Sequence, residues 1–128
     1  MSDSLEFTVP LVPPSVNHYK KPRGRGHGYY VTAEAEAFKR AVALCARGQS
    51  VSAKTYELEA RVYLGHKQRG DGDNFWKVIS DALVEARCIH SDAAVVTWIL
   101  HKARDRANPR TEILILAKEQ HRKAKATP

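Results

Sequence analysis

The residues of this chain best suited to chemistry lie in the segment 70–77, which reads GDGDNFWK. Asp71 and Asp73 alternate with glycines, and Lys77 follows Asp73 by four residues. Residues four apart stack along one face of a helix, so Asp81 continues that face. Mg²⁺ takes oxygen ligands and commonly combines one or two protein carboxylates with phosphate oxygens. The segment therefore predicts a divalent cation held beside a phosphate.

Other interpretations of the same aspartates exist. Asp73 is a natural helix N-cap and Asp71 a natural turn residue beside glycine, and both structural alternatives stay open. A calcium loop is excluded, because its sixth position is Trp76 instead of glycine and its twelfth is Ala82 instead of glutamate. A sugar-nucleotide transferase needs a parallel nucleotide-binding sheet, for which the chain has little room.

The elements that must position this segment follow from hydrophobic spacing. Alternating residues predict a strand over Tyr56–Leu64, and helical spacing predicts an amphipathic helix over Phe75–Ala86. The acidic segment therefore lies where a strand leads into a helix. The other predicted elements are a strand over Leu5–Leu11, a helix over Ala33–Arg47 capped by Thr32, and strands over Val95–Lys102 and Thr111–Ala117, the last two paired as a hairpin.

The order β-α-β-α-β-β predicts an α+β fold in which two helices pack on one face of a four-stranded mixed sheet. Residues 1–118 are expected to form a single domain, followed by a basic, disordered tail over 119–128. Asp92 lies just before the third predicted strand, as Asp73 lies after the second. If those strands are neighbours, Asp71, Asp73 and Asp92 can converge at one end of the sheet, where a divalent ion would offset their repulsion.

The charge pattern favours a polyanionic partner. Lys and Arg outnumber Asp and Glu by 21 to 14, which gives a net charge of +7. The segment Lys20–Gly28 holds four cations and three glycines and is predicted to be a flexible loop that contacts phosphates. The residues predicted to contact DNA are Asn17, Lys20, Lys21, Arg23, Arg25, Lys67 and Arg69.

Other features bound the function class. Cys45 and Cys88 have no metal-ligand spacing and are expected to be reduced filler residues. No apolar run is long enough to span a membrane and the N-terminus lacks the form of a signal peptide, so a cytoplasmic protein is expected. Of the six histidines, only His90 lies next to the acidic residues.

Several blocks together resemble the RusA family of Holliday-junction resolvases. The resemblance spans Val12–Lys102 and is carried by PPSVN at 13–17, DGDN at 71–74 with Lys77, DAL at 81–83, and DAAV at 92–95 with Lys102. It implies a small α+β homodimer, bacterial or encoded by a phage, that acts in DNA recombination and repair. Such an enzyme binds four-way DNA junctions and, with Mg²⁺ or Mn²⁺ and no organic cofactor, nicks two opposing strands symmetrically.

The resemblance also implies roles for individual residues. Asp71, Asp73 and Asp92 would be the metal-binding catalytic acids, and Lys77 the catalytic lysine. Asn74 either holds the neighbouring aspartates or starts the helix. Asp81 either positions Lys77 or belongs to a solvated face. The family often has two adjacent aspartates at the last site, whereas this chain has Ser91 before Asp92.

Two alternative functions remain. A non-catalytic protein that binds structured nucleic acid would use the aspartates only as caps and turns. A metal-dependent nuclease that acts on flaps or other branched DNA would share the active site but not the substrate.

Overall fold

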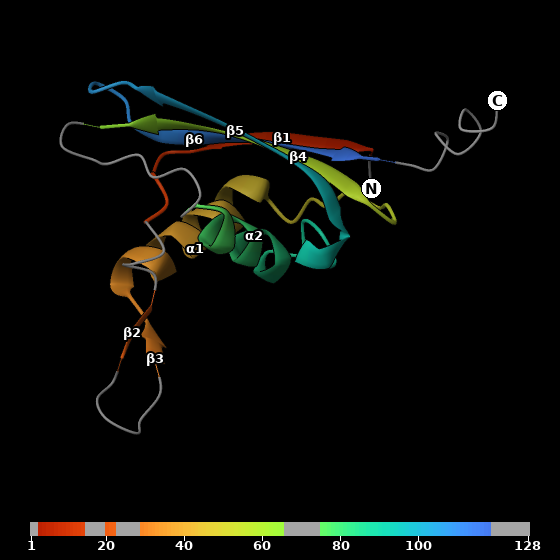
Figure 1. Cartoon of the computed structure of the whole chain (residues 1–128), viewed down its shortest axis with the longest axis horizontal. Coiled ribbons are helices and arrows are strands. Elements are labelled where there is room, and N and C mark those ends of the chain that lie inside the picture. The colour runs from red at the N-terminus through yellow and green to blue at the C-terminus, as the bar shows by residue number, and fades with distance from the viewer. Residues whose placement is uncertain (1–2, 15–19, 23–28, 66–74, 119–128) are drawn as a thin grey trace.

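The computed structural model describes residues 3–14, 20–22, 29–65 and 75–118. In chain order its elements are β1 (Ser4–Val9), β2 (Lys20–Pro22), β3 (Tyr29–Val31), α1 (Ala33–Ala46), β4 (Tyr56–Leu64), α2 (Trp76–Glu85), the 3-10 helix η3 (Asp92–Ala94), β5 (Val95–Arg104) and β6 (Arg110–Ala117). Figure 1 shows a sheet layer with α1 and α2 together on one of its faces, which confirms the predicted α+β architecture. No helix among the described residues is long and apolar enough to cross a membrane.

The main sheet is mixed, with the strand order β1-β6-β4-β5. β4 and β5 are parallel, whereas β6 pairs antiparallel with both β1 and β4. Parallel neighbours need a crossover connection, and α2 supplies it between β4 and β5.

The predicted hairpin between the last two strands is therefore wrong, because β4 lies between β5 and β6. The turn that follows β5 passes the end of β4 instead, where the Asp105 N–H donates to the Leu64 carbonyl at 2.9 Å. The sequence of this turn suits a hairpin equally well, because its length and composition do not specify which strand comes next in the sheet.

The core lies between the sheet and the two helices. In β4 the alternation is as predicted, with Leu58, Ala60 and Val62 buried. Phe38 and Val42 of α1 are fully buried in the same core. From α2, the buried side chains are those of Val78, Ile79, Ser80, Ala82 and Leu83.

The residues at the helix ends differ in how they cap each helix. The Thr32 side chain accepts a hydrogen bond from the Ala35 N–H at 3.3 Å, which confirms Thr32 as the N-cap of α1. α1 ends at Ala46, and its C-cap residue Arg47 has a left-handed φ of 55°. α2 has Phe75 at its N-cap position, with no side-chain cap. Asp73 lies outside the described residues, so its capping role stays a prediction.

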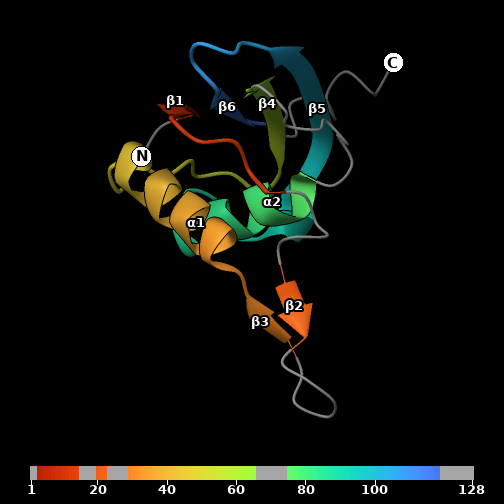
Figure 2. The same cartoon turned by 90° about the vertical axis from the view of Figure 1, so that its left-hand side faces the viewer.

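A small hairpin occupies part of the region predicted as a flexible basic loop. β2 and β3 pair antiparallel, with Lys20 opposite Val31 and Pro22 opposite Tyr29. Figures 1 and 2 both show this hairpin projecting from the start of α1, away from the main sheet. Strands of three residues are too short to show an alternating pattern, and the prediction missed them for that reason.

Candidate active site

Asp92 lies at the end of the sheet where β4 and β5 begin. Because the two strands are parallel, Val95 pairs with Tyr56 at that end, and Arg104 pairs with Leu64 at the other. Asp92 belongs to η3, directly before β5, and its side chain is exposed. This candidate ligand is therefore presented to solvent from a short turn that the sheet anchors.

The segment that holds the other two acids follows the opposite end of the sheet. Gly65 comes directly after β4 and is buried, and residues 66–74, with Asp71, Asp73 and Asn74, lie outside the described residues. The expected strands are neighbours, but a parallel pair does not bring the end of one strand to the start of the next. The end of β4 and the start of β5 therefore lie at opposite ends of the parallel pair. That the three acids meet stays a prediction.

A pocket of about 510 Å³ opens beside Asp92. It lies between α1, α2 and the connection that leads to η3, and it contains Asp81 as well as Asp92. Its lining residues are Val31, Lys39, Asp81, Val84, Glu85, His90, Ser91 and Asp92. The structure therefore brings two of the predicted site residues to one pocket.

The cations near this pocket are held by carboxylates. The Lys77 ammonium lies 3.7 Å from an Asp81 carboxylate oxygen, one helical turn away, and the Lys77 side chain is 53% exposed. The Lys39 ammonium lies 2.8 Å from Glu85, and its side chain is only 10% exposed. Asp81 therefore connects the candidate catalytic lysine to the pocket that contains Asp92, as a positioning residue would.

Ser91 has a defined structural role in place of an acid. Its hydroxyl accepts a hydrogen bond from the Ala93 N–H at 3.1 Å and so caps η3. The Ala94 N–H donates to the Ser91 carbonyl at 3.2 Å. Ser91 thereby fixes the backbone on both sides of Asp92.

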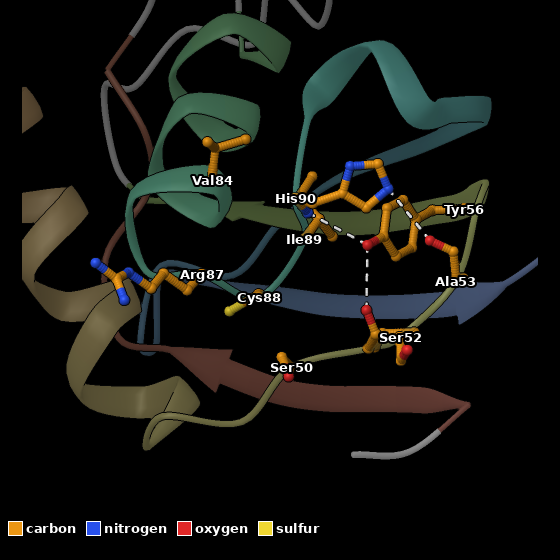
Figure 3. Close-up of a pocket in the computed structure, with 10 residues that line it drawn as sticks. Ser50, Ser52, Ala53, Tyr56, Val84, Arg87, Cys88, Ile89 and His90 are labelled. Carbon is orange, nitrogen blue, oxygen red and sulfur yellow. Dashed lines mark hydrogen bonds between the residues drawn. The ribbon is translucent and has the colours of Figure 1, made fainter.

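A second pocket of about 420 Å³ shares His90 with the first. Figure 3 shows the Tyr56 hydroxyl between two backbone segments. It donates to the Val51 carbonyl at 3.1 Å and accepts from the His90 N–H at 3.2 Å. The His90 ring nitrogen Nε2 lies 3.2 Å from the Ala53 carbonyl. These bonds fasten the connection before Asp92 to the 51–53 segment.

Tyr56 is a residue that the sequence analysis missed. It is the first inward residue of β4 and is 1% exposed, so its alternation with Leu58 predicts burial. A buried tyrosine generally needs a partner for its hydroxyl, and that need was the available signal. His90 contacts Tyr56 with its ring, at 5.4 Å between centroids, and has a structural role here.

The two cysteines are free, as expected, and Cys88 is fully buried. Burial raises the pKa of the Cys88 thiol to about 11, so this thiol is neutral near pH 7 and unsuited to bind a metal or act as a nucleophile.

The described part of the chain holds only part of the predicted metal site. No three His, Cys, Asp or Glu side chains gather there closely enough to hold an ion. Asp92 offers a hard oxygen donor of the kind Mg²⁺ prefers, and Asp71 and Asp73 would add two more. This donor set fits magnesium. Of the predicted DNA contacts, Lys20 and Lys21 lie in β2, whereas Asn17, Arg23, Arg25, Lys67 and Arg69 lie outside the described residues.

Comparison with known proteins gives one family. A family model described as endodeoxyribonuclease RusA matches residues 10–116, most of the chain. No curated protein shows significant similarity to the chain.

Proposed function

We propose that this chain, which belongs to the RusA endodeoxyribonuclease family, is a Mg²⁺-dependent enzyme that resolves four-way DNA junctions by paired symmetric nicks. Membership of the family implies a Holliday-junction resolving endonuclease. The observation that carries the proposal is the family match over residues 10–116, which includes every proposed catalytic residue. The shared pocket of Asp81 and Asp92, with Lys77 beside Asp81, supports it.

The proposed metal ligands are Asp71, Asp73 and Asp92, and Mn²⁺ would be accepted in place of Mg²⁺. When bound, the ion would supply a Lewis acid for a phosphate oxygen and for the attacking water. Without it, three carboxylates near a DNA phosphate would repel that phosphate. Asn74, next to Asp73, would hold this carboxylate in place through its side-chain amide.

Lys77 would stabilise the charge that develops on the phosphate during displacement. Its side chain is 53% exposed, so it can reach a bound strand, and its ammonium lies 3.7 Å from Asp81, which lines the pocket. An exposed ion pair of this kind contributes under about 1 kcal/mol to folding. The pair would therefore serve to place the ammonium and add little to stability.

The DNA surface would be formed by cations near the start of α1 and before the acidic segment. Lys20 and Lys21 lie in the projecting hairpin (Figure 2), and Arg23 and Arg25 follow directly in the sequence. Asn17, Lys67 and Arg69 complete the proposed set. Contacts of this type fix the position of the duplex without reading its sequence.

The test is a nicking assay on a synthetic four-way junction, a linear duplex and a flap, each with Mg²⁺ and with EDTA. We expect symmetric nicks in the junction only, and none in EDTA. Equal cleavage of the flap would indicate a general branched-DNA nuclease. Tight binding of the junction with no cleavage in Mg²⁺ or Mn²⁺ would indicate a binding protein.

A paired measurement separates chemistry from binding. Asp73→Asn and Asp92→Asn each remove one negative charge from a metal ligand at nearly constant volume. We expect nicking in Mg²⁺ to be abolished, while gel-shift affinity for the junction in EDTA stays equal or increases, because less negative charge faces the phosphates. Near-normal nicking by both variants would remove the aspartates from the mechanism.

A further inference from the structure

The two tryptophans of the chain, Trp76 and Trp98, touch each other beside the candidate site. Their ring centroids are 4.4 Å apart and their planes are inclined by 65°. Trp76 begins α2 and directly precedes Lys77, whereas Trp98 comes from β5. In an edge-to-face contact, the edge of one ring packs against the face of the other. The ring that contributes its edge therefore keeps its faces available for another contact.

The Trp98 side chain is unusually exposed to solvent for a residue of its size. It is 37% exposed, and Val96, two residues earlier on the same strand, is 55% exposed. β5 is an edge strand of the sheet, with β4 as its neighbour. An exposed indole at a sheet edge that core packing does not cover is a candidate contact surface.

Cations continue this surface along β5. Trp98 pairs with Leu58, and Lys102 pairs with Val62, whose side chains point to the helix-covered face. Trp98 and Lys102 therefore lie on the same side of the sheet as α2. The Arg104 guanidinium donates to the Gly65 carbonyl, directly after β4. Residues 93–104 contain no acid.

Aromatic and basic side chains without carboxylates suit nucleic acid better than a protein partner. Bases stack on aromatic rings whatever their sequence, and lysine and arginine neutralise the phosphates on either side. The cores of protein interfaces, in contrast, are depleted in lysine. In the open form of a four-way junction, the bases at the branch point lack a stacking neighbour on one side, so they are the bases available to a ring.

We propose that Trp98, supported by Trp76 and flanked by Lys102, is a stacking site for an unstacked base beside the branch point. The proposal rests on the proposed function, since it names how the same site recognises branched DNA. It assigns Trp98 to substrate selection and places no chemistry on it.

Intrinsic fluorescence tests the site directly, because Trp76 and Trp98 are the only tryptophans in the sequence. The full chain is titrated in EDTA with a four-way junction that carries 2-aminopurine next to the branch point, and with a linear duplex of the same composition. We expect the junction to quench tryptophan emission and change 2-aminopurine emission, and the duplex to do much less. Unchanged tryptophan emission in the saturated junction complex would overturn the proposal.

Substitutions give the second arm. Trp98→Leu keeps an apolar side chain but removes the ring, and should weaken junction binding roughly tenfold without changing its salt dependence. Trp98→Phe keeps a stacking ring and should stay close to wild type. Leu44→Ala is the matched control, because Leu44 is another exposed large apolar side chain, 77% exposed, on α1. Wild-type affinity for Trp98→Leu, or its dissociation into half-mass subunits, would overturn the proposal.

The two proposals fail separately. If the junction quenches tryptophan emission and Trp98→Leu weakens junction binding, but the wild type nicks no junction in Mg²⁺, the stacking site is supported and the catalytic function is rejected. If the wild type nicks junctions, and Trp98→Leu binds and nicks them equally well, the catalytic function is supported and the stacking site is rejected. Circular dichroism shows whether Trp98→Leu folds. If it does not fold, the quenching of wild-type tryptophan emission by the junction alone decides whether the stacking site exists.

Discussion

At the scale of single residues, Ser91 determines how Asp92 is presented. Its hydroxyl caps η3, and aspartate, asparagine and serine cap about equally well. The family often has a second carboxylate at this position. This chain therefore keeps the cap and gives up one negative charge beside the proposed metal.

Ser91→Asp should restore that charge without disturbing the turn. We expect the Mg²⁺ concentration for half-maximal nicking to fall several-fold, because the affinity of a cation site rises with the charge of its ligands. Ser91→Asn is the matched control, since it caps without charge and should leave the Mg²⁺ requirement unchanged. The same requirement for all three proteins would contradict a role for position 91 near the ion.

Residue types predicted part of the candidate site. Lys77 and Asp81 are four apart in a predictable helix, so their contact follows from helical spacing, and the structure confirms it. The role of Tyr56 could not be predicted. Its hydroxyl joins segments that are 5 and 34 residues away in sequence, and no local pattern contains that information.

At the scale of elements, the connection from α2 to η3 depends on Tyr56. Tyr56→Phe would leave the Val51 carbonyl and the His90 N–H without their shared partner. We expect the free energy of unfolding, measured by urea denaturation, to fall by about 1–3 kcal/mol. Tyr63→Phe is the control, because the Tyr63 hydroxyl lies 3.5 Å from Glu112 and is only part-buried. Equal small losses for both variants would contradict the tether.

The projecting hairpin allows a separate test of DNA contact. If Arg23 and Arg25 each contact a phosphate, replacing both by alanine should weaken junction binding and reduce the salt slope by about 1.8, or 0.9 for each contact. Arg61→Ala is the control, since Arg61 pairs with Glu59 on the face of the sheet away from the helices. An unchanged slope at several salt concentrations would exclude these arginines from the DNA surface.

The elements themselves were largely predictable, but their pairing was not. Alternation and capping gave both helices and all four strands of the main sheet to within a few residues. The order of the strands in the sheet could not be predicted, because a β5–β6 hairpin and the observed crossover place the same residues on the same faces of the sheet. That Asp71 and Asp73 meet Asp92 stays a prediction, because residues 66–74 lie outside the described residues.

At the scale of the whole molecule, the parallel pair makes a dimer relevant to the active site. The acidic segment follows one end of β4, and Asp92 precedes the start of β5 at the other end. A two-fold dimer would match the two-fold junction and allow one subunit's acidic segment to meet Asp92 of its neighbour. We therefore expect light scattering to give twice the chain mass.

Mixing subunits tests this arrangement. When Asp73→Asn and Asp92→Asn chains are combined, a site shared between subunits yields mixed dimers with one intact site, which nick one strand. A site built within one subunit leaves both sites of the mixed dimer damaged. We expect single nicks from the mixture and none from either variant alone. An inactive mixture, or a strict monomer on the junction, would contradict the shared site.

The central place of β6 in the sheet also governs how the molecule is made. Among the described strands, β1 pairs only with β6, and β6 begins at Arg110, about a hundred residues after β1 ends at Val9. During synthesis the apolar side of β1, with Leu5, Phe7 and Val9, therefore emerges from the ribosome with no strand to pair with. Contacts so distant in sequence form slowly, because the long loop must close first. The nascent chain thus exposes an unpaired strand edge until β6 has been synthesised, and such an edge favours aggregation.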